Sequence, residues 1–109
     1  MLSVVIPVYN EEKQIGKTIK EVKDAVTRTG EEFEIIVIDD GSADDTWEVL
    51  KKLADENAEV KAYRFSRNFG KEAALMAGLS KADGDACITM DADLQHPPEL
   101  IPEMVKLWR

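Results

Sequence analysis

The residues best suited to chemistry in this chain are Asp91 and Asp93, which are separated by one residue. They follow the apolar run 86–89, which is typical of a buried strand, so both carboxylates are expected where a strand ends and a loop begins. In an open α/β sheet, ligands bind at this carboxyl edge. Paired carboxylates there suit a hard divalent cation that also binds phosphate oxygens, and Gln95 adds a neutral oxygen. An acidic turn is the alternative interpretation of the pair alone.

Two further loops carry polar side chains after apolar runs. Tyr9 and Glu11 follow the first run, where the ring could face a nucleotide base and the carboxylate could accept ribose hydroxyls. Asp39 and Asp40 follow the second run, where one could cap the next helix and the other could accept hydrogen bonds from a base or a ribose. The alternatives are simple packing for Tyr9, a favourable helix-dipole contact for Glu11 and a plain turn for the two aspartates.

A third loop holds Arg67 and Lys71, which could face a base or a phosphate or could be solvated surface. His96, the single histidine, is followed by two prolines and is expected to be a turn residue, with a metal or phosphate contact as the alternative. No nucleophile triad can be built around it. Cys87, the single cysteine, lies in an apolar run and is expected in the core.

The elements that position these loops alternate between strand and helix. Helical spacing of apolar residues follows each strand, and Gly30 is a plausible helix stop. Asn10, and Ser42 together with Asp45, are expected to cap helices, and Pro7 within a strand predicts a bulge. The strands are expected at 2–9, 33–38, 60–65 and 86–89, and the helices at 15–26, 47–53, 73–79 and 100–108.

This alternation predicts an α/β fold, a Rossmann-like parallel sheet with helices on both faces. The expected strand order is 3-2-1-4, which places all the strand-to-helix loops at one carboxyl edge. The order of the strands reverses between strands one and four, so residues 9–11 and 91–95 are expected to flank one crevice.

Composition excludes several classes of function. The 109 residues fit one domain or part of one, and a net charge of −8 argues against nucleic acid and against an anionic membrane surface. A phosphate-bearing ligand would therefore need a metal, helix N-termini or specific Lys and Arg side chains. No glycine-rich dinucleotide motif or Walker A motif follows a strand. With no signal peptide and no apolar run of about 20 residues, the chain is expected in the cytoplasm.

The motifs in this order resemble the nucleotide-sugar-binding half of family 2 glycosyltransferases, which have the GT-A fold. The resemblance rests on Pro7-Val8-Tyr9-Asn10-Glu11, Asp39-Asp40-Gly41-Ser42 and Asp91-Ala92-Asp93. Residues 67–71 and 93–99 resemble the branch that transfers sugars to polyprenyl phosphates, which includes dolichyl-phosphate mannosyltransferase and bacterial undecaprenyl-phosphate glycosyltransferases.

This resemblance implies a role for each matching residue. Asp93 and Gln95 would ligate Mg²⁺ or Mn²⁺, with Asp91 contributing through the metal or the ribose, and the two aspartates would be the catalytic pair. Asp40 would contact the base with Asp39 beside it. The remaining nucleotide-sugar contacts implied are Pro7, Tyr9, Glu11, Lys71 and Arg67.

The resemblance also implies partners and a reaction. The donor would be a UDP- or GDP-linked sugar, and a dolichyl or undecaprenyl phosphate would attack it with inversion, in cell-envelope or glycan biosynthesis. Family members are longer, so residues 1–109 are expected to be the donor-binding part of a truncated domain, inactive alone. The full-length protein would work at the cytoplasmic face of a membrane.

Several alternatives stay open from the sequence. A family 2 transferase could act on a polysaccharide or another lipid, and the chain could be a non-catalytic nucleotide-binding module. A receiver-type signalling domain fits poorly, because strand one leads to Tyr9 and strand three to Arg67. With strand four at an edge of the sheet, self-association through that edge is also expected.

Overall fold

The computed structural model describes residues 1–92 and 100–108, and it contains the strands and helices predicted from the sequence. The four strands are parallel and lie in the predicted order β3-β2-β1-β4. In chain order the elements are β1 (Leu2–Val8), α1 (Ile15–Thr27), β2 (Phe33–Asp39), α2 (Thr46–Glu56), β3 (Val60–Arg64), α3 (Lys71–Lys81), β4 (Ala86–Thr89) and α4 (Leu100–Trp108).

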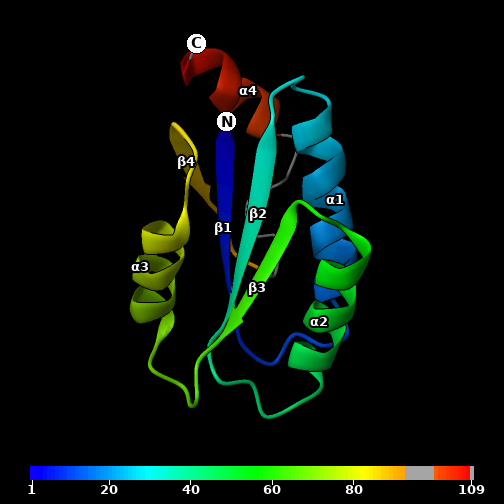
Figure 1. Ribbon diagram of the computed structural model, residues 1–109, viewed down its shortest axis with the longest axis vertical. Coiled ribbons are helices and arrows are strands. Elements are labelled where there is room, and N and C mark those ends of the chain that lie inside the picture. Colours follow the sequence, from blue (N-terminus) through cyan, green and yellow to red (C-terminus); the bar gives the residue numbers. More distant parts are fainter. Residues whose placement is uncertain (93–99, 109) are drawn as a thin grey trace.

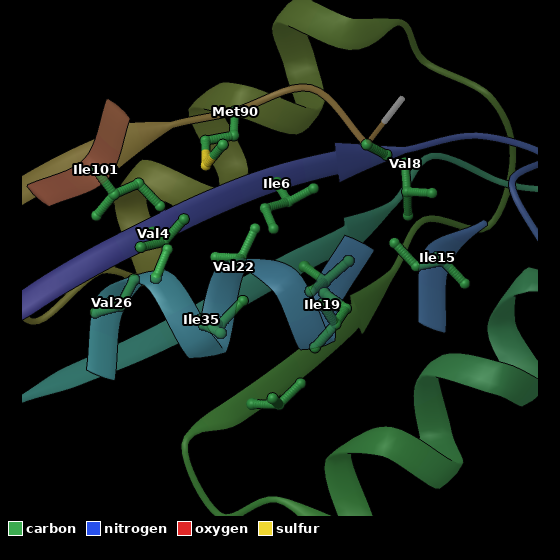
Figure 2. Packing of buried hydrophobic residues seen from close by; sticks show 14 of the residues in the cluster. Val4, Ile6, Val8, Ile15, Ile19, Val22, Val26, Ile35, Met90 and Ile101 are labelled. Carbon is green, nitrogen blue, oxygen red and sulfur yellow. The ribbon is translucent and has the colours of Figure 1, made fainter. Parts of the chain in front are cut away.

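Helices cover both faces of the sheet, with α3 on one face and α1 and α2 on the other (Figure 1). The larger core joins β1 and β2 to α1, and Figure 2 shows Ile19 and Val22 of the helix pointing at Val4 and Ile6 of the strand. Ile101 and Val105 of α4 complete this cluster. The smaller core packs Ala74 of α3 against Val5, Ile36 and Ile38. Burial on both faces explains why β1 and β2 are continuous apolar runs.

Pro7 does not cause the predicted bulge, because β1 and β2 stay in unbroken register from Leu2 to Val8. The N–H of Leu2 and the carbonyl of Val8 form hydrogen bonds on the side of β2. The backbone groups of the odd-numbered residues of β1, which include Pro7, therefore point toward β4. Pairing with β4 ends at Val5 opposite Thr89. The missing N–H of Pro7 therefore lies beyond the end of β4, and the proline costs no ladder hydrogen bond.

The prediction that Cys87 lies in the core is wrong, because the side chain is exposed. Cys87 lies opposite Ser3 on β4, the edge strand of the described sheet. α3 packs against β1 and β2 and leaves this part of the sheet face uncovered. An apolar strand at the edge of a sheet is exposed wherever no helix covers it.

A buried polar network joins the amino ends of three strands. The carboxylate of Glu34 in β2 accepts hydrogen bonds from the Ser3 hydroxyl (2.6 Å) and the Asp83 N–H (2.7 Å), and it pairs with the Lys61 ammonium (2.8 Å). Burial raises the pKa of Glu34, but the bonds from Lys61, Ser3 and Asp83 outweigh burial and hold the pKa below its ordinary value. The ionised form therefore stabilises the fold.

In residues 1–92 and 100–108, no helix is both long enough and apolar enough to cross a membrane.

Candidate functional site

A cleft of about 220 Å³ opens at the carboxyl edge of the sheet. The loops that follow β1, β2 and β3 gather at this end of the molecule, the lower end in Figure 1. The described residues that line the cleft come from all four strand ends: Pro7, Val8, Tyr9, Glu11, Asp40, Lys71, Asp91 and Ala92. The predicted crevice between the loops after β1 and β4 is therefore present.

Asp91 lies at the end of β4 with its side chain 21% exposed, and its carboxylate forms an ion pair with the ammonium of Lys71. Lys71 is the first residue of α3, and both residues line the cleft. The pair thus connects the start of α3 to the segment that follows β4, at the cleft.

Asp40 is almost fully buried, and its carboxylate is bonded to the loop before α3. It accepts hydrogen bonds from the N–H groups of Phe69 (2.8 Å) and Gly70 (3.1 Å) and from the side-chain amide of Asn68 (3.2 Å). These amides lead into the N-terminus of α3, where a carboxylate is favourable. Asp40 therefore anchors α3 while it lines the cleft.

Asp39 is fully buried. Neither Asp39 nor Arg67 is among the described residues that line the cleft. Oδ1 of Asp39 accepts the Ser42 N–H (2.9 Å), whereas Oδ2 has no hydrogen-bond partner in the described part of the chain. Gly41 between them has a φ of 71°, and a Cβ there would lie 2.3 Å from the backbone of Arg67. Asp39 and Gly41 therefore shape the turn after β2 so that Asp40 meets the next loop.

Hydrogen bonds across loops replace the predicted helix caps. The N–H of Asn10 donates to Ser42 Oγ (2.8 Å), and Asn10 Oδ1 accepts the Ala43 N–H (2.8 Å). α1 begins at Ile15 as predicted, but its N-cap residue is Gln14, so the prediction that Asn10 caps it is wrong. The predicted capping box of Ser42 and Asp45 is also wrong. Ser42 is used by the β1 loop instead.

Asp44 joins the first residue of α2 to the loop after β1. It accepts the N–H of Thr46 (3.0 Å) and the N–H of Glu12 (3.3 Å), while the Thr46 hydroxyl accepts the Glu11 N–H (2.9 Å). Burial raises the pKa of Asp44, but the bonds from Thr46 and Glu12 outweigh burial and keep the pKa below its ordinary value. Tyr9 and Glu11 are therefore held on a loop bonded to α2.

Thr18 is a site residue that the sequence analysis missed. Its buried hydroxyl donates to the carbonyl oxygen of Ala92 (2.8 Å), the residue between Asp91 and Asp93. Thr18 shares the buried face of α1 with Ile15 and Val22. A hydroxyl-bearing residue on an otherwise apolar helix face is the sequence signal that could have identified it.

Arg67 lies in the loop before α3, with its guanidinium 4.6 Å from the centre of the Phe69 ring. Phe69 is about half exposed and also meets Phe65 edge-on at 5.5 Å. Arg67 is therefore held by stacking on the loop before α3, outside the cleft.

The predicted residues Asp93, Gln95 and His96 lie outside the described residues. Within residues 1–92 and 100–108, no three His, Cys, Asp or Glu side chains are grouped to hold a metal ion. Asp91, the first residue of the Asp91-Ala92-Asp93 motif, lies within the described residues. Its carboxylate offers the hard oxygen ligands that divalent cations prefer.

Comparison with known proteins identifies relatives along almost the whole chain. Residues 3–109 match the family model described as glycosyl transferase family 2. An uncharacterized glycosyltransferase, YkcC of Bacillus subtilis, is 44% identical over 98% of this chain and 33% of its own length. Undecaprenyl-phosphate 4-deoxy-4-formamido-L-arabinose transferase of Klebsiella pneumoniae is 45% identical over 96% of this chain and 32% of its own length. The chain spans about a third of the length of these curated relatives.

Solved structures share the fold. S. aureus TarS 1-349 in complex with UDP-GlcNAc superposes with a TM-score of 0.67 at 26% identity, over 84% of this chain and 26% of that chain. Mannosyltransferase PcManGT from Pyrobaculum calidifontis, in complex with GDP-Man and Mn²⁺, superposes with a TM-score of 0.75 at 24% identity, over 84% of this chain and 27% of that chain. The sheet and its helices are thus those of GT-A glycosyltransferases.

Proposed function

The chain belongs to glycosyltransferase family 2, and we propose that it supplies the donor and metal site for inverting transfer of a sugar from a nucleotide diphosphate sugar to a polyprenyl phosphate. The cleft at the carboxyl edge carries this proposal, because loops from all four strands bring an aromatic ring, carboxylates and a lysine together there. The names of relatives 43–46% identical to this chain support undecaprenyl phosphate as the acceptor.

The nucleoside lies against the loops after β1 and β2. Tyr9 is 47% exposed and lines the cleft, so its ring can stack on a base, and Pro7 lines the same cleft. Glu11 binds the ribose hydroxyls. Asp40 contacts the base through lone pairs left after its bonds to the α3 loop, and Asp39 acts by holding the turn that presents Asp40. Arg67 binds at the rim.

Asp91, Asp93 and Gln95 hold Mg²⁺ or Mn²⁺. The donor set fits such a cation, because all three offer oxygen ligands and Asp91 faces the cleft. When bound, the cation neutralises the diphosphate and stabilises it as a leaving group. Without it the cleft would repel an anion, since Glu11, Asp40 and Asp91 line its wall.

The acceptor phosphate attacks the anomeric carbon from the face opposite the diphosphate. A phosphate is already ionised at neutral pH, so this reaction requires no strong general base. The acceptor is membrane-bound, so we place the longer protein at the cytoplasmic face of a membrane. The acceptor site belongs to the part of the relatives that this chain does not span.

Calorimetry of the chain with UDP and with GDP tests the donor site. One nucleotide should bind in Mn²⁺ and lose most of its affinity in EDTA, and Asp91→Asn should reduce the Mn²⁺-dependent part. Asp83→Asn is the matched control. Asp83 lies in the turn before β4, so this substitution removes the same charge at a position away from the cleft. Equal affinity in Mn²⁺ and in EDTA would overturn the metal-bridged site.

A further inference from the structure

Lys71 has an unusual electrostatic position. It is the first residue of α3, where the helix dipole disfavours a cation. The amides that lead into that helix are already bonded to Asp40. The ammonium is stabilised instead by the carboxylate of Asp91, which follows β4. Among residues 1–92 and 100–108, the one ion-pair partner of Lys71 is therefore Asp91, and Asp91 is a candidate metal ligand.

The same oxygen of Asp91 cannot serve an ammonium and a divalent cation at full strength. The ion pair uses Oδ1, and Asp91 is 21% exposed while Lys71 is 61% exposed. The lysine is thus the more exposed of the two side chains, and it is the partner with room to turn away. The space on either side allows such movement, because Lys71 lines both the main cleft and a hollow of about 150 Å³ formed with Leu75 and Thr89.

We propose that Lys71 exchanges partners during donor loading: it neutralises Asp91 until a divalent cation takes that carboxylate, and it then turns into the cleft to bind the anionic part of the nucleotide. This inference rests on the proposed function, since it takes Asp91 as a metal ligand. Lys71 therefore lowers the affinity for metal alone and raises the affinity for nucleotide with metal. Because coupling between two ligands is reciprocal, the exchange makes metal and donor bind cooperatively.

The test is the direction in which Lys71→Gln changes two affinities, one for Mn²⁺ alone and one for nucleotide in the presence of Mn²⁺. Mn²⁺ binding is measured by the loss of the free-ion electron paramagnetic resonance signal, and nucleotide binding by calorimetry at saturating Mn²⁺. A half-exposed ion pair corresponds to a change of about two- to five-fold. The variant should bind Mn²⁺ alone about two- to five-fold more tightly and bind UDP or GDP with Mn²⁺ more weakly. The gain in Mn²⁺ affinity should shrink at high salt.

Three further variants isolate the exchange. Lys81→Gln removes the same charge at the other end of α3 and should leave both affinities unchanged. Lys71→Arg keeps the charge and should stay close to the wild type in Mn²⁺ affinity. In an Asp91→Asn background, Lys71→Gln should no longer raise the affinity for Mn²⁺, because the competed carboxylate is gone.

The outcomes separate the two proposals. If the wild type binds Mn²⁺ through Asp91 but Lys71→Gln leaves that affinity unchanged, Lys71 is a plain nucleotide ligand and the exchange is refuted. If both affinities fall, Lys71 is structural and the exchange is again refuted. If neither the wild type nor Lys71→Gln binds Mn²⁺, or if Asp91→Asn has no effect on Mn²⁺ binding, the proposed metal site itself is wrong. The exchange is then refuted together with the metal site.

Discussion

Replacing Glu34 with Gln should destabilise the fold far more than its conservative character suggests. The buried carboxylate accepts three hydrogen bonds, two at Oε2 from Ser3 and Asp83 and one at Oε1 from Lys61. An amide has one accepting oxygen, so one side of the network must face its NH₂ group. Glu34→Gln thus keeps the shape of the side chain and removes about half of its accepting capacity.

The best orientation of the amide keeps its oxygen where Oε2 accepts from Ser3 and Asp83, so the bond from Lys61 at Oε1 is the one that is lost. A hydrogen bond to a charged group contributes about 1.5–3 kcal/mol, and this one falls at the low end because the side chain of Lys61 is 43% exposed and solvent screens it. The expected loss of stability is therefore about 1.5 kcal/mol, which corresponds to a fall in Tm of about 5–10 °C for a domain of this size.

Urea unfolding followed by circular dichroism measures the effect. Glu32→Gln is the matched control, because it removes the same charge from an exposed side chain two positions earlier and should change stability by less than about 0.5 kcal/mol. Equal stabilities of the two variants would refute the role given to the network.

The pH dependence gives a second check with a definite sign. The pKa of Glu34 is held below its ordinary value of 4.5, so the ionised form stabilises the folded state. This contribution is complete above the pKa of the unfolded chain and is lost as pH falls through the folded value. The stability difference between the wild type and Glu34→Gln should be constant above about pH 5.5 and should shrink below about pH 4.5. A difference that grows in acid would contradict this assignment.

Three further predictions concern the site and the sheet edge. Thr18→Val should lower Mn²⁺ affinity several-fold at a stability loss of about 1 kcal/mol, Thr18→Ser should restore the affinity, and unchanged Mn²⁺ binding by Thr18→Val would show that the bond to Ala92 does not position the metal loop. Asp93→Ala in the longer protein should lower sugar transfer by orders of magnitude with a near-normal Tm, and near-normal turnover would refute its role as a ligand. The chain should self-associate through β4, which light scattering across a concentration series measures. Thr89→Lys places a charge on that exposed strand and should reduce the association. A wild type that stays monomeric at high concentration would refute the predicted self-association.

The fold was predictable because burial patterns report strands and helices locally. The apolar runs at β1 and β2 and the helical spacing of Ile15, Ile19 and Val22 predicted these elements within a few residues. The meeting of the loops followed from topology, since parallel strands present their carboxyl ends at one edge.

The partners of the polar side chains were not predictable in the same way. Asn10 and Ser42 have the composition of helix caps, yet each bonds to the other's loop. The pairing of Lys71 with Asp91 and of Thr18 with Ala92 depends on distances between elements that are far apart in the chain. Cys87 was misplaced for a related reason, because an apolar strand does not reveal whether a helix will cover it.

The hydrogen bonds between loops have a consequence for protein engineering. The loop after β1 is bonded to the loop after β2 through Asn10, and that loop is bonded to the one before α3 through Asp40. A graft that moves a single loop from a relative would break bonds on both sides, whatever the quality of the loop itself. Exchange of donor specificity should therefore succeed when residues 9–14, 40–46 and 66–71 are transplanted as one block, so the unit of modularity in this site is the set of three loops.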